Sequence, residues 1–336
     1  MRIHSAAWLA AWLAGWAVLP AGCRRAPPSG GAAPGRDRPT ARKAQPGSQP
    51  AGGPASGPVA ARSRGYRIAH VFVCLCDNAH QGIVPVPKAL GNGQDPKSNL
   101  YWGAMYGVKT FLRRSPHWRQ IAGARVALGA DAGAVLDTAV FELAGRPKTY
   151  LLAEAFDGAK MPSALQRFFE AAAGRLARVA AWGRGERQTV VRAGGAADVV
   201  CFVGHNGLMD HRLSHAPRRA AGAAGPARAI VLACKSRDDF VEPLRRAGCS
   251  PLITTSGLMA PEAYTLDAAL RSWAAGEPAA TTYLRAARAY ATYQKCSLSA
   301  AKRLFVTPAA GRELPKHDAP APRGKPSGSG SSRQRP

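Results

Sequence analysis

Runs of apolar residues alternate with amphipathic stretches along the middle of this chain. Short uninterrupted runs such as AIVLA at 229–233 are typical of strands buried on both faces of a sheet. The longer stretches between them carry apolar residues every three or four positions, which is typical of helices packed on a sheet. The alternation predicts an α/β fold with a mostly parallel sheet and helices on both faces. Strands are predicted at 67–76, 124–133, 148–158, 197–207, 227–236 and 250–257, helices at 99–114, 162–182, 237–248, 261–276 and 278–305, and 134–143 is ambiguous.

The first 23 residues have the pattern of an export signal. A short basic start precedes an apolar run at 6–19, which is too short to span a bilayer, and small residues lead to Cys23. The closing LPAGC resembles the end of a bacterial lipoprotein signal, although Pro20 stands where such signals usually carry leucine. This resemblance implies that Cys23 is lipidated and holds an exported protein on the membrane of the cell envelope. An ordinary cleaved signal peptide is the alternative.

Composition sets the remaining boundaries. Residues 24–65 and 307–336 are rich in Pro, Gly, Ala and Ser or in basic residues and offer little to bury, so we expect a disordered tether and a disordered basic tail. Residues 66–306 have the length of one α/β domain with a full core.

The net charge of +26 is spread over the chain. Residues 1–65 hold nine basic residues and one aspartate, and 307–336 hold six basic and two acidic residues, which leaves 31 basic and 17 acidic residues in the domain. These are scattered arginines without interleaved aromatic residues, and no nucleic-acid motif is present. We therefore interpret the charge as a solvated surface and expect no nucleic-acid partner.

Six cysteines follow Cys23. Cys74, Cys201 and Cys234 fall in apolar strand-like runs, which favours buried small side chains over a disulfide framework. Cys74 and Cys76 are not followed by a second closely spaced pair, so no zinc site is predicted. No metal or cofactor is expected.

Two strand ends carry residues capable of nucleophilic chemistry. VVCFVGHNG brings His205 to the end of one apolar strand, and IVLACKS brings Cys234 to the end of the next. If the two strands are neighbours, the imidazole could activate the thiol at the edge of the sheet where sites collect. The N–H of Gly207, together with that of Cys234, could then stabilise an oxyanion. For each residue alone, the alternative is a packing or turn residue.

The order of these two strands resembles that of the caspase-like cysteine peptidases of clan CD, which include caspases, metacaspases, legumains and gingipains. A strand ending in His-x-Gly precedes a strand ending in Ala-Cys, and LLAEAFDGAKMPSALQRFFEAAAG resembles the strand, loop and helix before that family's histidine. VFVCLCDN stands where the family's first strand does, and the likeness covers about residues 66–260. It implies a three-layer sandwich, with His205 as catalytic histidine, Cys234 as nucleophile and Gly207 at the oxyanion hole. Asn206 between His205 and Gly207, and Lys235-Ser236 after the cysteine, depart from the family's pattern.

The loops after the first and last strands would line a substrate pocket in this architecture. They contribute Asp77, Asn78 and Ser256, with Asp210 near the proposed site. An aspartate in the pocket would favour a basic substrate residue, whereas the alternative is that these side chains cap turns or helices.

Two functions from different classes remain open from the sequence. The first is a membrane-tethered cysteine endopeptidase that acts on a peptide or protein substrate through His205 and Cys234. The second is a catalytically inactive protein of the same fold that binds a partner or acts as a scaffold at the envelope.

Overall fold

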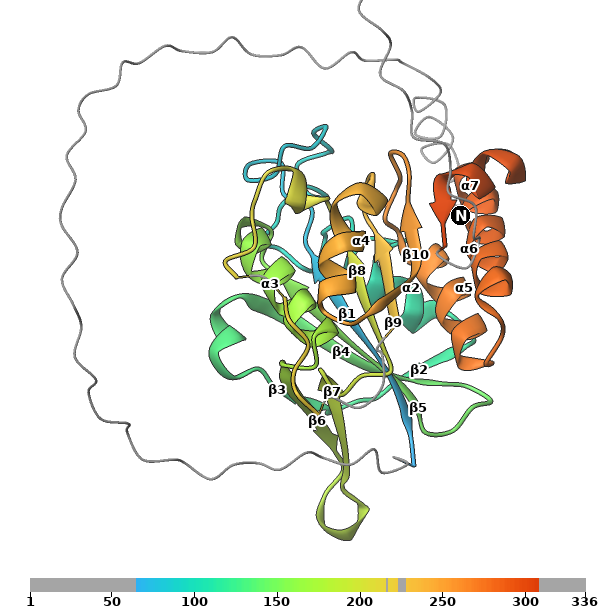
Figure 1. Ribbon diagram of the computed structural model, residues 1–336. Helices are drawn as coiled ribbons and strands as arrows, with labels where there is room; N and C mark the ends of the chain where they lie inside the picture. The colour runs from blue at the N-terminus through green and yellow to red at the C-terminus, as the bar shows by residue number, and fades with distance from the viewer. Residues whose placement is uncertain (1–64, 216, 223–227, 308–336) are drawn as a thin grey trace, which may run out of the picture. The chain divides into compact units, whose positions relative to one another are not determined.

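The computed structural model describes residues 65–215, 217–222 and 228–307 (Figure 1). The predictions of a signal peptide, lipidation at Cys23 and a tether fall on residues outside this range, apart from Gly65. The predicted tail also lies outside it from residue 308 onward. The domain predicted at 66–306 falls within the described part of the chain, apart from residues 216 and 223–227.

An eight-stranded mixed sheet forms the centre of the fold. Five neighbouring strands, β10, β9, β8, β1 and β5, are parallel, while β4 and β2 at one edge and β11 at the other are antiparallel to their neighbours. The prediction of an α/β fold with a mostly parallel sheet is therefore confirmed. The strands are β1 (Arg67–Cys74), β2 (Trp118–Gln120), β4 (Val135–Leu143), β5 (Thr149–Phe156), β8 (Val199–Val203), β9 (Arg228–Leu232), β10 (Ser250–Thr255) and β11 (Phe305–Val306).

Alternate residues of the buried strands face two separate hydrophobic clusters. In β9, Ile230 and Leu232 pack in the cluster that includes residues of α2, α5 and α6, whereas Val231 packs with α3 and α4 on the opposite face. In Figure 1, α5 and α6 lie to the right of the sheet and α3 lies to the left. The helices are α2 (Val108–Arg114), α3 (Met161–Ala172), α4 (Ser236–Arg246), α5 (Ala263–Ala274), α6 (Ala279–Gln294) and α7 (Leu298–Leu304).

A second, smaller sheet corrects the helix predicted over 162–182. The helix α3 ends at Ala172, and after Gly174, at φ +76°, the chain enters β6 (Ala177–Trp182). This strand pairs in antiparallel fashion with β3 (Arg125–Ala127) and β7 (Thr189–Gly194), the latter being missed by the sequence analysis. An apolar, alanine-rich run suits either a buried helix or a strand, and here the pairing partners decide.

Other element boundaries also differ from the predictions. The helix predicted from residue 99 begins at Val108, because Asn99 is buried and its side chain bonds both the N–H and the C=O of Cys76 in a turn. The ambiguous segment 134–143 is the strand β4, and the strand predicted at 124–133 is β3 followed by a 3₁₀ turn, Gly129–Gly133. The last predicted helix is divided at Lys295, which has a left-handed backbone at φ 53°.

The six cysteines of the described residues are all free thiols. Cys74 and Cys201 are completely buried, as the sequence predicted, whereas Cys234 is only partly buried. Across the described residues, no helix has the length and apolar character needed to cross a membrane.

Candidate functional site

The ends of β8 and β9 bring the two predicted catalytic residues to corresponding positions. The strands are parallel neighbours, and Val199 to Val203 pair in constant register with Arg228 to Leu232. His205 and Cys234 each come two residues after the last pair, so both lie just beyond the carboxyl ends of neighbouring strands. The proposed dyad requires that the two strands are neighbours, and the fold meets this requirement. The carboxyl ends of the strands lie toward the top of Figure 1.

The imidazole of His205 is paired with a carboxylate. Its Nε2 lies 2.7 Å from Oδ2 of Asp210, and the side chain of His205 is 12% exposed. A carboxylate accepts a hydrogen bond from Nε2–H, which leaves Nδ1 of the neutral ring as the nitrogen that accepts a hydrogen bond. This pairing gives Asp210 an orienting role that the sequence analysis did not foresee.

The thiol of Cys234 is held by the loop between β10 and α5. Its Sγ lies 3.5 Å from the carbonyl oxygen of Met259 and accepts a hydrogen bond from the Met259 N–H at 3.4 Å. Burial raises the pKa of the Cys234 thiol, and the N–H groups of Met259 and of Cys234 itself, with the charge of Lys235, oppose this only in part. The thiol is therefore protonated at neutral pH in the resting protein. Within the described residues, no hydrogen bond joins Sγ of Cys234 to the His205 ring.

The backbone turns sharply directly after the cysteine. Lys235 adopts a left-handed conformation at φ 49° and ψ 29° and precedes the first residue of α4. Its N–H bonds the carbonyl oxygen of Gly257 at 2.9 Å. A non-glycine residue in this region is strained and persists where its surroundings fix it, as they often do at functional sites.

Asn206 connects the two strand ends through its side chain. This completely buried residue donates from Nδ2 to the carbonyl oxygen of Cys234 at 2.8 Å and to Oδ2 of Asp239 at 2.7 Å. In the sequence, Asn206 is only a departure from the family pattern. Only the folded protein shows that the Asn206 side chain bonds the segment that follows the neighbouring strand.

Gly207 occupies a tight turn next to the histidine. Its N–H donates to the carbonyl oxygen of His205 at 2.9 Å, so an oxyanion at this position would compete with that bond. A Cβ at Gly207 would lie 2.4 Å from Cγ of Met161, which explains why the turn needs glycine. The N–H of Cys234 makes no hydrogen bond to another described residue, so an oxyanion there would not compete with such a bond.

Asp77 and Asn78 form the frame of the loop that follows β1. The buried carboxylate of Asp77 accepts from the N–H of Ala79 and from Gln94 Nε2, at 2.9 and 2.8 Å, and contacts the ring of His80. Burial acts to raise its pKa, but the hydrogen bonds from Gln94, His80 and Ala79 outweigh burial, and the net pKa is lowered. The side chain of Asn78 bonds both the C=O and the N–H of Val86. These contacts agree with turn-capping roles.

The hydroxyl of Ser256 points to the carboxyl end of α7. Oγ donates to the carbonyl oxygens of Arg303 and Leu304, at 2.8 and 3.2 Å. The residue therefore holds α7 and β11 against the end of β10.

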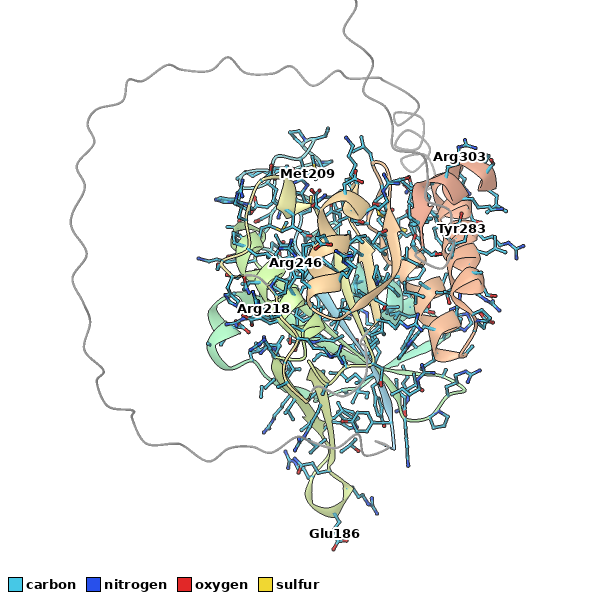
Figure 2. The ribbon with its side chains drawn as sticks, viewed as in Figure 1. Glu186, Met209, Arg218, Arg246, Tyr283 and Arg303 are labelled. Atoms are coloured by element: carbon cyan, nitrogen blue, oxygen red, sulfur yellow. The ribbon has the colours of Figure 1, made fainter. Side chains whose placement is uncertain are left out.

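An open cavity of about 580 Å³ lies between the segment after His205 and α4. Asp210 and Asp239 line it together with Arg212 and two residues labelled in Figure 2, Met209 and Arg246. The side chain of Asp210 is 44% exposed, so it can contact both the cavity and His205. Within the described residues, no group of three or more His, Cys, Asp or Glu side chains is arranged to hold a metal ion.

Comparisons of the chain with protein-family models, with curated proteins and with solved structures find no match.

Proposed function

We propose that this protein is a caspase-like cysteine endopeptidase, in which Cys234 attacks a peptide carbonyl and His205 transfers the proton. The observation that carries this proposal is the shared register of β8 and β9, which sets a thiol and a carboxylate-paired imidazole at one sheet edge. Helices on both faces of the sheet are consistent with the three-layer arrangement that the resemblance implies.

The proposed reaction starts from a protonated thiol. As Sγ of Cys234 bonds to the carbonyl carbon, its proton moves to Nδ1 of His205, and the backbone N–H of Cys234 faces the oxyanion. The imidazolium then protonates the leaving amine as the peptide C–N bond breaks and a thioester forms. Water, deprotonated by the same ring, cleaves the thioester and restores the thiol.

The peptide or protein substrate would reach this edge through the neighbouring cavity. Asp210 is the predicted substrate-binding residue whose carboxylate lines it, and it is the reason to test substrates with basic residues first. In the same proposal the protein is exported and held at the cell envelope through lipidated Cys23.

Peptide hydrolysis tests the proposal directly. A peptide library is incubated with the wild type, Cys234→Ala and Cys234→Ser, with Cys296→Ala as the control because Cys296 is the other partly exposed cysteine of the described residues. We expect both Cys234 variants to lose activity by about a thousandfold or more while Cys296→Ala retains it. Undiminished hydrolysis by folded Cys234→Ala would falsify the proposal.

A second candidate function is a non-catalytic binding or scaffold protein at the envelope. Two observations favour it: the Cys234 sulfur already has backbone partners, and the Gly207 N–H is already bonded. This function predicts no hydrolysis and slow iodoacetamide labelling of Cys234 at neutral pH that does not change in His205→Ala. The peptidase predicts labelling that falls when His205 is removed.

A further inference from the structure

The bond pattern of Asn206 differs from that of an ordinary buried amide. Both Nδ2 protons are used, one on the carbonyl oxygen of Cys234 and one on the carboxylate of Asp239, while its buried Oδ1 has no hydrogen-bond partner among the described residues. Leaving a buried acceptor unpaired is unfavourable. The favourable contribution of the Asn206 side chain to the folded structure therefore comes from its two donated hydrogen bonds.

These bonds lie where the sheet no longer holds the two strands together. The last backbone hydrogen bond between the two segments, within the described residues, runs from the Gly204 N–H to the carbonyl oxygen of Leu232 at 3.2 Å. The N–H of Cys234 does not continue the ladder to Gly204. The Asn206 side chain therefore makes a hydrogen bond between the two segments where the backbone no longer does. This bond fixes the Cys234 backbone to the segment that carries His205.

Other contacts hold each of the two segments, the one around His205 and the one around Cys234, in a fixed conformation. On the histidine side, Asn206 is at the centre of a turn closed by the Gly207 N–H, and Gly207 is packed against Met161. On the cysteine side, the Lys235 N–H is bonded to Gly257. Asn206 joins two rigid units, so its loss would change the position of one relative to the other.

We infer that Asn206 is a positioning residue, which holds the Cys234 thiol at the correct separation from the His205 ring by its hydrogen bond to the Cys234 carbonyl oxygen. Asp239 orients the Asn206 amide from α4. This inference rests on the proposed function, because it assumes that the thiol and the imidazole act together.

The test measures labelling of Cys234 by iodoacetamide from pH 5 to pH 10, resolved by mass spectrometry of the Cys234 peptide, so that no substrate is needed. In the wild type we expect a step in the labelling profile that depends on the imidazole, in addition to the alkaline rise from the thiol. His205→Ala removes this step and thereby tests the dyad. Asn206→Ala tests the positioning role, and we expect loss of the same step with labelling at pH 7 slower by roughly tenfold.

The matched control is Gln166→Ala. Gln166 is a buried amide on α3 that accepts from the Ser214 N–H and so anchors another part of the connection between β8 and β9, without contact to Cys234. Gln166→Ala should lower the free energy of unfolding and leave the pH profile of Cys234 labelling unchanged. Labelling of Cys296 in every variant reports any general loosening of the fold.

The outcomes separate the inference from the function on which it rests. If His205→Ala leaves the wild-type profile unchanged, both the dyad and the role of Asn206 in it are wrong. If His205→Ala removes the step and folded Asn206→Ala retains it, the dyad stands and the inference is overturned. If Asn206→Ala does not fold, Asp239→Ala decides: a weakened step supports the inference, and the wild-type profile overturns it.

Discussion

The carboxylate of Asp210 lies 2.7 Å from Nε2 of His205, five residues away along one short turn. A carboxylate in this position fixes the ring orientation and keeps the proton on Nε2, which leaves Nδ1 as the base. The same carboxylate lines the neighbouring cavity, so one residue serves both orientation and substrate contact in the proposed site.

Replacing Asp210 by asparagine should therefore impair the proposed hydrolysis without unfolding the protein. An amide can present its N–H to Nε2 and favour the wrong tautomer, so we expect kcat to fall by about a hundredfold or more. Steady-state kinetics check this, with Asp238→Asn as the control because its side chain is 54% exposed and bonded to Arg237. Equal effects of the two substitutions would contradict the orienting role.

The thiolate of Cys234 should form only at alkaline pH. Burial raises its pKa above the usual thiol value of 9.0, so the ionisation seen in His205→Ala, where no imidazole contributes, should lie above that value. The pH profile of iodoacetamide labelling measures it. A titration midpoint below pH 8 would show that the thiol is activated in the resting protein, contrary to this expectation.

Arg178 should be a main determinant of stability. Its side chain is buried between two carboxylates, with Nε 2.6 Å from Glu154 Oε1 and a further ion pair to Asp131. Arg178→Ala removes the partner that these two carboxylates share, and leaves Glu154 with His70 and Asp131 with Arg167. We expect a cost of about 3–5 kcal/mol in the free energy of unfolding. Urea denaturation measures the loss. Arg119→Ala, which removes an exposed ion pair to Glu142, should cost less than about 1 kcal/mol, and a similar cost for both would refute the argument.

The same cluster predicts how stability depends on pH. Burial acts to raise the pKa of Glu154, but His70 and Arg178 outweigh it and lower the pKa below 4.5. The unfolded chain then binds this proton more readily than the folded protein does, so stability is present above pH 4.5 and is lost as the pH falls through the lowered pKa. Urea midpoints between pH 6 and 3 should decline in the wild type, and less steeply in Glu154→Gln. An identical slope would exclude Glu154 as a contributor.

Gly207→Ala should destabilise the turn that carries His205. The new methyl group would lie 2.4 Å from Cγ and 2.7 Å from Sδ of Met161, a side chain that is itself buried. Overpacking of this kind costs about 1–3 kcal/mol, which thermal unfolding would detect. At Gly133, where an added Cβ meets nothing within 4 Å, alanine should change the free energy of unfolding by less than about 0.5 kcal/mol.

Much of the central sheet could be predicted from the sequence, because β1, β5, β8 and β9 are mostly apolar runs whose burial follows from their composition. The segment 177–182 could not, since an alanine-rich apolar run suits a helix equally well until β3 and β7 supply hydrogen bonds. The helical start at Val108 depends likewise on the contact of Asn99 with Cys76, two loop residues that are 23 positions apart in the chain.

The candidate site divides in the same way. The sequence by itself determined that His205 and Cys234 end two apolar strands, because each strand's hydrophobicity is local information. Only the tertiary structure decided that these strands are parallel neighbours, so that the two residues follow the strand ends at one edge of the sheet. It also decided that Asp210 turns to His205 and that Asn206 bonds the Cys234 carbonyl oxygen. Register and side-chain partners depend on which chain segments become neighbours, and no local pattern of residues carries that information.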